Sequence, residues 1–96
     1  MNYKSVQISE VFPWDKNPRG FKQAEFDRLK RQIQELGVFK PLLCFEEGGK
    51  YFVLGGNLRL RAYRELGLAE VELVIVDPKT EAGKIKYNLA DNDRSG

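Results

Sequence analysis

The sequence predicts a small α+β domain whose strands and helices follow the order β-α-β-β-α-β-α and share one mixed sheet. Short apolar runs of strand length are separated by glycine turns, and other segments carry apolar residues at the three- and four-residue steps of a helix. The 96 residues are 42% hydrophobic and 31% charged, a composition typical of one globular domain. We therefore expect residues 1–96 to form a single domain. Because the chain stops directly after the third predicted helix, we expect it to be the first part of a longer protein.

The N-terminal third predicts a strand, a loop and a helix. The alternating segment from Ser5 to Val11 predicts a strand, and the prolines and glycine between residues 12 and 20 predict a loop. A helix is expected from Gln23 to Leu36 because apolar residues recur there at helical spacing and Gly37 is a natural stop. Those apolar positions are Phe26, Leu29, Ile33 and Leu36.

The middle of the chain predicts a hairpin followed by a second helix. Two apolar runs, residues 42–45 and 51–54, flank a Gly48-Gly49 pair that supplies the positive φ values of a tight turn. Gly55-Gly56 then ends the second strand, and the segment from Asn57 to Leu66 has the spacing of a helix.

The remaining segments predict a strand and a third helix. The run from Val71 to Val76 is almost continuously apolar, which is typical of a strand buried on both faces. Thr80 is a suitable N-cap for a helix whose apolar positions are Ala82, Ile85 and Leu89.

The composition excludes several kinds of chemistry. The chain has no histidine, which removes Ser-His-Asp and Cys-His catalysis and histidine-bound zinc. Its lone cysteine, Cys44, suits a reducing cytoplasm and is expected to be a small buried hydrophobe. No run of about 18 apolar residues exists, so we expect no membrane partner. A formal charge of +2 is too small to indicate a stand-alone nucleic-acid binder.

The most informative segment is the turn Gly55-Gly56 and the helix that follows it. The first N–H groups of a helix lack internal partners and carry partial positive charge, so anions bind there. Arg59 and Arg61 add guanidinium groups suited to phosphate oxygens. The alternative is that the glycines only turn the chain while both arginines are solvated. The physical argument alone does not favour either the anion-binding or the purely structural interpretation.

Several motifs resemble one known family. The Asn17-Pro18-Arg19 segment, the helix from Leu29 to Gly37, the Pro41-Leu42-Leu43 segment and the glycine–arginine box at residues 56–62 occur in the family's order and spacing. They are similar to the ParB N-terminal domain of the ParB/sulfiredoxin superfamily, also called the ParB-like nuclease domain. The resemblance runs from about Val6 to Asn92 and looks closest to phage and mobile-element members.

The resemblance implies a nucleotide site. In ParB proteins the box grips the triphosphate of CTP, and an early Asn-Pro-Arg segment lies close to the nucleotide. A later Glu-Asn-x-x-Arg element helps to hold Mg²⁺, and its counterpart here is Asp91-Asn92, whose oxygens suit that ion. The phosphate-binding positions implied in this chain are Gly55, Gly56, Asn57, Arg59, Arg61, Asn17 and Arg19.

The box also departs from related sequences. Chromosomal ParB proteins carry Gly-Glu-Arg-Arg, whereas Asn57 and Leu58 replace the glutamate and the first arginine here. The choice between CTP and a related nucleotide, and its hydrolysis, therefore stay open. Sulfiredoxin uses a cysteine at the position of Asn57, so its activity is not expected without that thiolate.

Three functions remain in competition. We favour a nucleotide-binding domain of a DNA-partition or DNA-modification system, encoded by a bacterium, plasmid or phage, that closes onto a second copy and reaches DNA through regions outside this chain. The second is an enzyme: a metal-dependent nuclease using Glu81, Asp91 and Asp93, or a phosphotransferase of the ParB fold. The third is a DNA-binding or interaction domain indifferent to nucleotide. For the acids a solvated helix end is the preferred interpretation, and for Phe12 and Trp14 a place in the core rather than stacking on a base.

Overall fold

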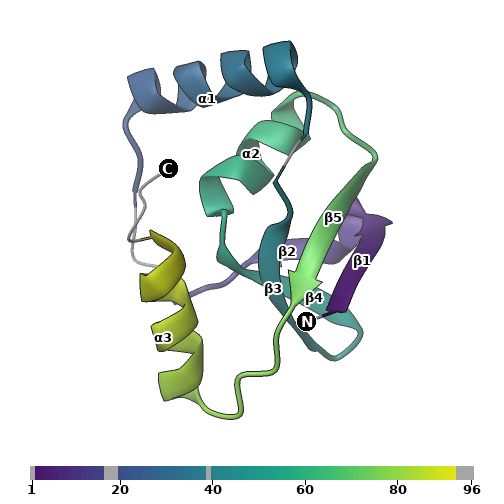
Figure 1. Cartoon of the computed structure of the whole chain (residues 1–96), viewed down its shortest axis with the longest axis vertical. Coiled ribbons are helices and arrows are strands. Elements are labelled where there is room, and N and C mark those ends of the chain that lie inside the picture. Colours follow the sequence, from purple (N-terminus) through teal and green to yellow (C-terminus); the bar gives the residue numbers. More distant parts are fainter. Residues whose placement is uncertain (1, 17–19, 39, 93–96) are drawn as a thin grey trace.

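The structure is a computed structural model that describes residues 2–16, 20–38 and 40–92, without the side chains of Asp91 and Asn92. In this part of the chain the strands are β1 (Asn2–Gln7), β2 (Val11–Pro13), β3 (Leu42–Glu47), β4 (Lys50–Gly55) and β5 (Glu70–Ile75). The helices are α1 (Gln23–Leu36), α2 (Asn57–Glu65) and α3 (Glu81–Asn92), and a 3₁₀ helix spans Ile8–Glu10 (Figure 1).

The strands form one mixed sheet in the order β1-β5-β3-β4-β2. The β1–β5 and β3–β4 pairs are antiparallel, whereas β3–β5 and β2–β4 are parallel. The β3–β4 hairpin turns at Gly48 and Gly49, both with positive φ, as the sequence predicted. The predicted α+β class with a mixed sheet is confirmed.

One predicted strand is wrong. The segment from Ser5 to Val11 is not a single strand: a 3₁₀ helix divides it between β1 and β2, which lie at opposite edges of the sheet. The sequence pattern is consistent with this break. Val6 and Ile8 are two residues apart and would lie on the same face of one strand, whereas Val11 is one residue out of that alternation. The break places Val6 and Val11 in the same core from two different strands.

The short link between β1 and β2 forces the sheet to curl. In a flat sheet of this width the two edge strands would lie about 19 Å apart. The three residues of the 3₁₀ helix rise only about 6 Å. The amine of Lys4 in β1 donates a hydrogen bond to the Tyr51 hydroxyl in β4 at 2.7 Å, which shows that the curled sheet brings distant strands within reach.

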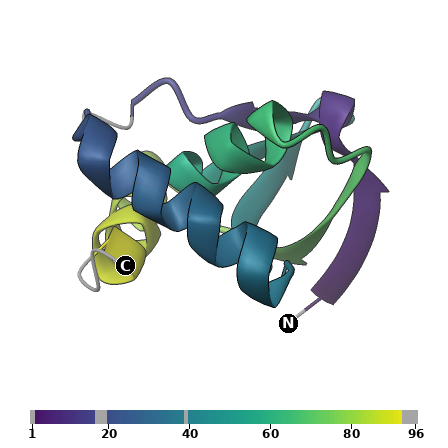
Figure 2. The ribbon, with the colours of Figure 1, turned by 90° about the horizontal axis from the view of Figure 1, so that it is seen from above.

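The helices cover two faces of the sheet (Figures 1 and 2). α1 packs on α2, and both bury apolar residues in the larger core over one face. Strand residues alternate between the faces, so that Leu42 and Cys44 join this core while Leu43 and Phe45 face the other side. α3 lies on that other side, over a smaller core of Trp14, Phe45 and Leu54.

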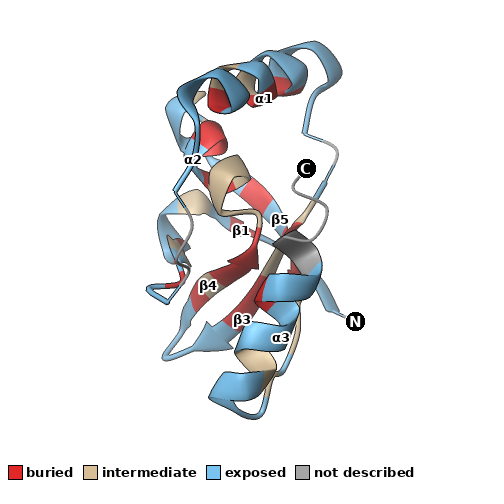
Figure 3. Ribbon diagram, turned by 90° about the vertical axis from the view of Figure 1, so that its left-hand side faces the viewer, coloured by how far each residue is buried: buried red, intermediate tan, exposed pale blue. Residues whose placement is uncertain are grey.

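The inner face of α3 differs from the sequence prediction. Ile85 and Leu89 are 47% and 61% exposed, whereas Asn88 is buried. Lys84 and Asn88, four residues apart, both face the sheet, because Lys84 lies over the Phe45 ring and Asn88 bonds to β4. Exposed residues accordingly dominate α3 in Figure 3, while β3 and β4 are mostly buried.

Candidate functional site

The glycine turn leads directly into an uncapped helix. Gly55 is paired with Leu43 as the last residue of β4, and Gly56 adopts φ 106° and ψ 25° before α2 begins at Asn57. No side chain caps this helix, and no acidic residue lies in its first turn. The first helical hydrogen bond runs from the N–H of Leu60 to the carbonyl of Gly56. The three N–H groups before it have no acceptor within the helix, so the start of α2 can receive an anion.

Gly56 also has a packing role. A Cβ atom at this position would lie 2.8 Å from Cδ2 of Leu42, whose side chain is fully buried in β3. The left-handed backbone and this close contact both require glycine, independently of any ligand. The interpretation that the glycines serve to turn the chain is therefore correct for Gly56, whether or not an anion also binds there.

The two arginines of the box lie on different sides of α2. Residues two apart on a helix do not face each other. The Arg61 guanidinium lies 4.6 Å from the centre of the Phe21 ring, just before α1. Arg59 is half-buried and interacts with the Tyr63 hydroxyl, which in turn donates to the carbonyl of Lys40 at 3.1 Å. Burial raises the pKa of Tyr63, and the charge and hydrogen bond of Arg59 oppose that rise.

Asn57 is unusual among the residues of the box. Both polar atoms of its side chain, Oδ1 and Nδ2, are buried, and neither has a hydrogen-bond partner in the described part of the chain. Buried polar atoms nearly always have a partner. Sequence reasoning placed Asn57 in the site only through the family resemblance, and nothing in the sequence indicates an unsatisfied amide.

α3 brings its C-terminal turns to the same region (Figures 1 and 2). Its predicted N-cap is confirmed, because the Thr80 hydroxyl accepts the N–H of Gly83 at 3.0 Å. At the other end, Nδ2 of the buried Asn88 donates to the carbonyl of Leu54 at 2.8 Å. This bond fixes α3 beside the end of β4, one residue before the glycine pair. Asp91 and Asn92 follow in the last turn of α3.

Some predicted site residues cannot be placed. Asn17 and Arg19 lie outside the described residues, as does Asp93. The side chains of Asp91 and Asn92 also lie outside the description.

Glu81 does not join Asp91 in the acidic metal cluster that was the alternative to a solvated helix end. Glu81 and Asp91 lie in the first and last turns of this helix, about 15 Å apart along its axis. The carboxylate of Glu81 pairs instead with Lys16 at 2.8 Å and with Lys84 at 3.0 Å. Among the described residues, no three potential metal ligands of the Cys, Asp or Glu type gather in one place.

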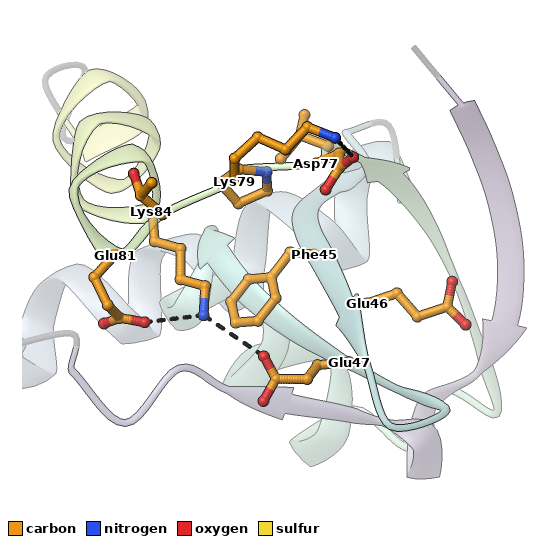
Figure 4. Close-up of a pocket in the computed structure, with 10 residues that line it drawn as sticks. Phe45, Glu46, Glu47, Asp77, Lys79, Glu81 and Lys84 are labelled. Carbon is orange, nitrogen blue, oxygen red and sulfur yellow. Dashed lines mark hydrogen bonds and ion pairs between the residues drawn. The ribbon is translucent and has the colours of Figure 1, made fainter.

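A hollow of about 440 Å³ lies at the opposite end of α3 from the box (Figure 4). Phe45 forms part of its lining, and the Lys84 ammonium lies between Glu47 at 3.6 Å and Glu81 at 3.0 Å. These opposite charges satisfy one another, which makes the hollow a poor phosphate site. Because its residues come from three separate segments, no local sequence pattern indicates the hollow.

Solved structures show the class of fold. The C-terminally truncated chromosome-partitioning protein ParB from Caulobacter crescentus, complexed with CTP-gamma-S, superposes with a TM-score of 0.86 at 21% identity, over 98% of this chain and 54% of that one. Sulfiredoxin from Arabidopsis thaliana gives a TM-score of 0.69 at 20% identity, over 93% of this chain and 98% of that one. The chain has the ParB/sulfiredoxin-like fold.

The family follows from the sequence comparison. Residues 1–92 match the family model of the ParB N-terminal domain, and the chain belongs to this family. A probable chromosome-partitioning protein ParB from Campylobacter jejuni is 33% identical over 73 residues, which are 75% of this chain. The aligned part is 26% of that relative, so the chain spans about a quarter of its length. No helix in the described ranges is long and apolar enough to cross a membrane.

Proposed function

We propose that this chain is the nucleotide-binding domain of a bacterial, plasmid or phage DNA-partition protein, and that it holds the phosphates of CTP or a related nucleoside triphosphate. The uncapped start of α2 carries this proposal, because its free N–H groups follow a left-handed glycine and no acid lies in the first turn. Membership of the ParB N-terminal family and the CTP-gamma-S bound to the Caulobacter relative support the choice of ligand.

Each residue of the box has a distinct role in the proposed site. The turn at Gly55 and Gly56 directs the helix N–H groups toward a phosphate, and Arg59, in the first turn, supplies the principal cation. Arg61 lies on another side of the helix, against Phe21, and adds positive charge at the rim. Asn17 and Arg19 complete the site by resemblance to the family, in which the corresponding segment lies close to the nucleotide.

The family resemblance also leads us to propose that Mg²⁺ binds at the end of α3. Mg²⁺ is commonly held by one or two protein carboxylates together with substrate phosphates and water. Asp91 and Asn92 offer one carboxylate and one amide oxygen in the last turn of α3. The Asn88–Leu54 bond holds that helix beside the β4 end from which α2 begins. When bound, the ion would neutralise part of the triphosphate charge.

The domain is proposed to act as a switch rather than as a DNA reader. A nucleotide at the start of α2 would favour closure onto a second copy, and DNA would be read by regions outside this chain. The formal charge of +2 supports this division, since strong stand-alone DNA binding requires a larger positive surface. Cytoplasmic action follows from such a role.

Calorimetric titration with CTP, ATP, GTP and UTP in Mg²⁺ tests the proposal. We expect saturable binding of one nucleotide, a weaker response with EDTA, and loss of binding in Arg59→Ala, which should still fold. Removing a charged hydrogen bond of about 1.5–3 kcal/mol weakens binding roughly 10- to 150-fold. Arg31→Ala, at an exposed position on α1, is the matched control and should bind as the wild type does. If no nucleotide binds to the folded wild type, or if Arg59→Ala retains full affinity, the proposed site is wrong.

A further inference from the structure

Asn57 and Asn88 both have a side-chain amide that is covered from solvent, but the hydrogen bonding of the two amides differs. Asn88 is 4% exposed, and its amide donates to the carbonyl of Leu54 at 2.8 Å. The amide of Asn57 is also covered from solvent, but neither of its polar atoms has a partner among the described residues. An unsatisfied buried donor or acceptor carries the full cost of its lost hydration. Asn57 therefore gains no hydrogen bond from the described part of the fold, whereas Asn88 gains one.

The position of Asn57 indicates what could satisfy its amide. It is the first residue of α2 and directly follows Gly56, so it begins the same turn whose backbone N–H groups lack helical acceptors. The amide group is neutral and carries two N–H donors. Nδ2 can therefore donate to a phosphate oxygen without adding a charge to the site.

We propose that Asn57 senses occupancy of the nucleotide site: its amide is covered and unsatisfied in the empty domain, and it turns to donate from Nδ2 to a phosphate oxygen when nucleotide binds. This inference rests on the proposed function, and it adds a coupling between ligand binding and stability. The residue lowers the stability of the empty state and raises affinity for the occupied state. Binding should therefore stabilise the wild type more than a variant that lacks the amide.

Asn57→Leu separates the two effects, because leucine has the same branched arrangement of side-chain heavy atoms as asparagine but no polar side-chain atom. Without nucleotide, we expect its melting temperature to rise by about 4–8 °C, the shift typical of a modest stabilisation in a domain of this size. Affinity for the nucleotide identified with the wild type should fall about tenfold or more. Asn88→Leu is the matched control for stability: the same change leaves the Leu54 carbonyl without its donor and should lower the melting temperature.

The outcomes distinguish this inference from the proposed function. If the wild type binds nucleotide and Asn57→Leu binds it equally well, the sensing role is wrong while the site stands. A lower melting temperature in Asn57→Leu means that the asparagine does not lower the stability of the domain without nucleotide, and this also overturns the inference. If the wild type binds no nucleotide, the proposed function itself fails, and the sensing role fails with it. In ¹⁵N-labelled wild type, the Asn57 side-chain amide signals should shift on binding and become more slowly exchanging.

Discussion

Replacing Gly56 with alanine tests the packing at the start of α2. The substitution places one methyl group at a residue with φ 106°, in the left-handed region that side chains disfavour. It also brings that methyl carbon to 2.8 Å from Cδ2 of Leu42, which is much closer than carbon atoms pack. Leu42 cannot move easily, because it is fully buried in the larger core.

The two effects add to a large loss of stability. A left-handed backbone costs a residue other than glycine about 1–2 kcal/mol. Forcing an extra methyl group into a packed core typically costs about 1–3 kcal/mol. Their sum of about 2–5 kcal/mol compares with a total stability of roughly 5–14 kcal/mol for a domain of this length. We therefore expect Gly56→Ala to lose a large part of its folding free energy and to melt about 10 °C or more below the wild type.

Urea denaturation followed by circular dichroism measures this loss, with Gly67→Ala as the matched control. Gly67 also has a positive φ, of 81°, but a Cβ there would meet no atom within 4 Å. Gly67→Ala should thus lose only the backbone contribution of about 1–2 kcal/mol. If Gly56→Ala is no less stable than Gly67→Ala, the contact with Leu42 does not constrain this turn. Loss of nucleotide binding in a Gly56 variant would not by itself identify a ligand contact.

Two further predictions concern titrating groups. Burial raises the pKa of the Cys44 thiol to about 12, so native protein should resist alkylation at pH 8 until it unfolds. Because the pKa of Cys44 in the folded state lies above its unfolded value near 9, the unfolding free energy should fall as pH rises from about 9 to 12, by up to about 1.4 kcal/mol per pH unit. If the unfolding free energies of wild type and Cys44→Ala change in parallel over this pH range, the prediction is refuted. Hydrogen bonds from Lys16 and then Lys84 lower the pKa of Glu81, so Lys16→Met should raise that pKa in an NMR titration of side-chain carboxyl carbons. An unchanged Glu81 titration in Lys16→Met would mean that the Lys16 pair is not formed in solution.

The sequence predicted best where one local pattern decides the structure. α1 spans Gln23–Leu36 as expected, because its apolar positions lie on one face and a glycine with positive φ follows its end. The β3–β4 hairpin was readable for a similar reason, since two adjacent glycines between apolar runs favour a tight turn. In both cases the local signal and the packing agree.

The prediction failed where distant contacts decide the structure. The expected strand from Ser5 to Val11 is divided because each half pairs with a different partner, β1 with β5 and β2 with β4. In α3, apolar spacing selected Ile85 and Leu89 as inner residues, but the helix turns Lys84 and Asn88 toward the sheet. Those two polar residues face inward because Phe45 and the Leu54 carbonyl give each of them a specific partner.

The candidate site combines both kinds of information. The glycine turn and the arginines of α2 were visible as a local motif, yet the sequence could not tell a phosphate-binding turn from a structural one. The geometry shows that Gly56 is required for packing against Leu42 whether or not a ligand binds. Asn57 is different, because its buried amide has no hydrogen-bond partner among the residues that the structure describes. A residue that weakens the fold at the start of an anion-accepting helix is the strongest pointer to a ligand in this domain, and for that reason Asn57→Leu is more informative than any glycine substitution.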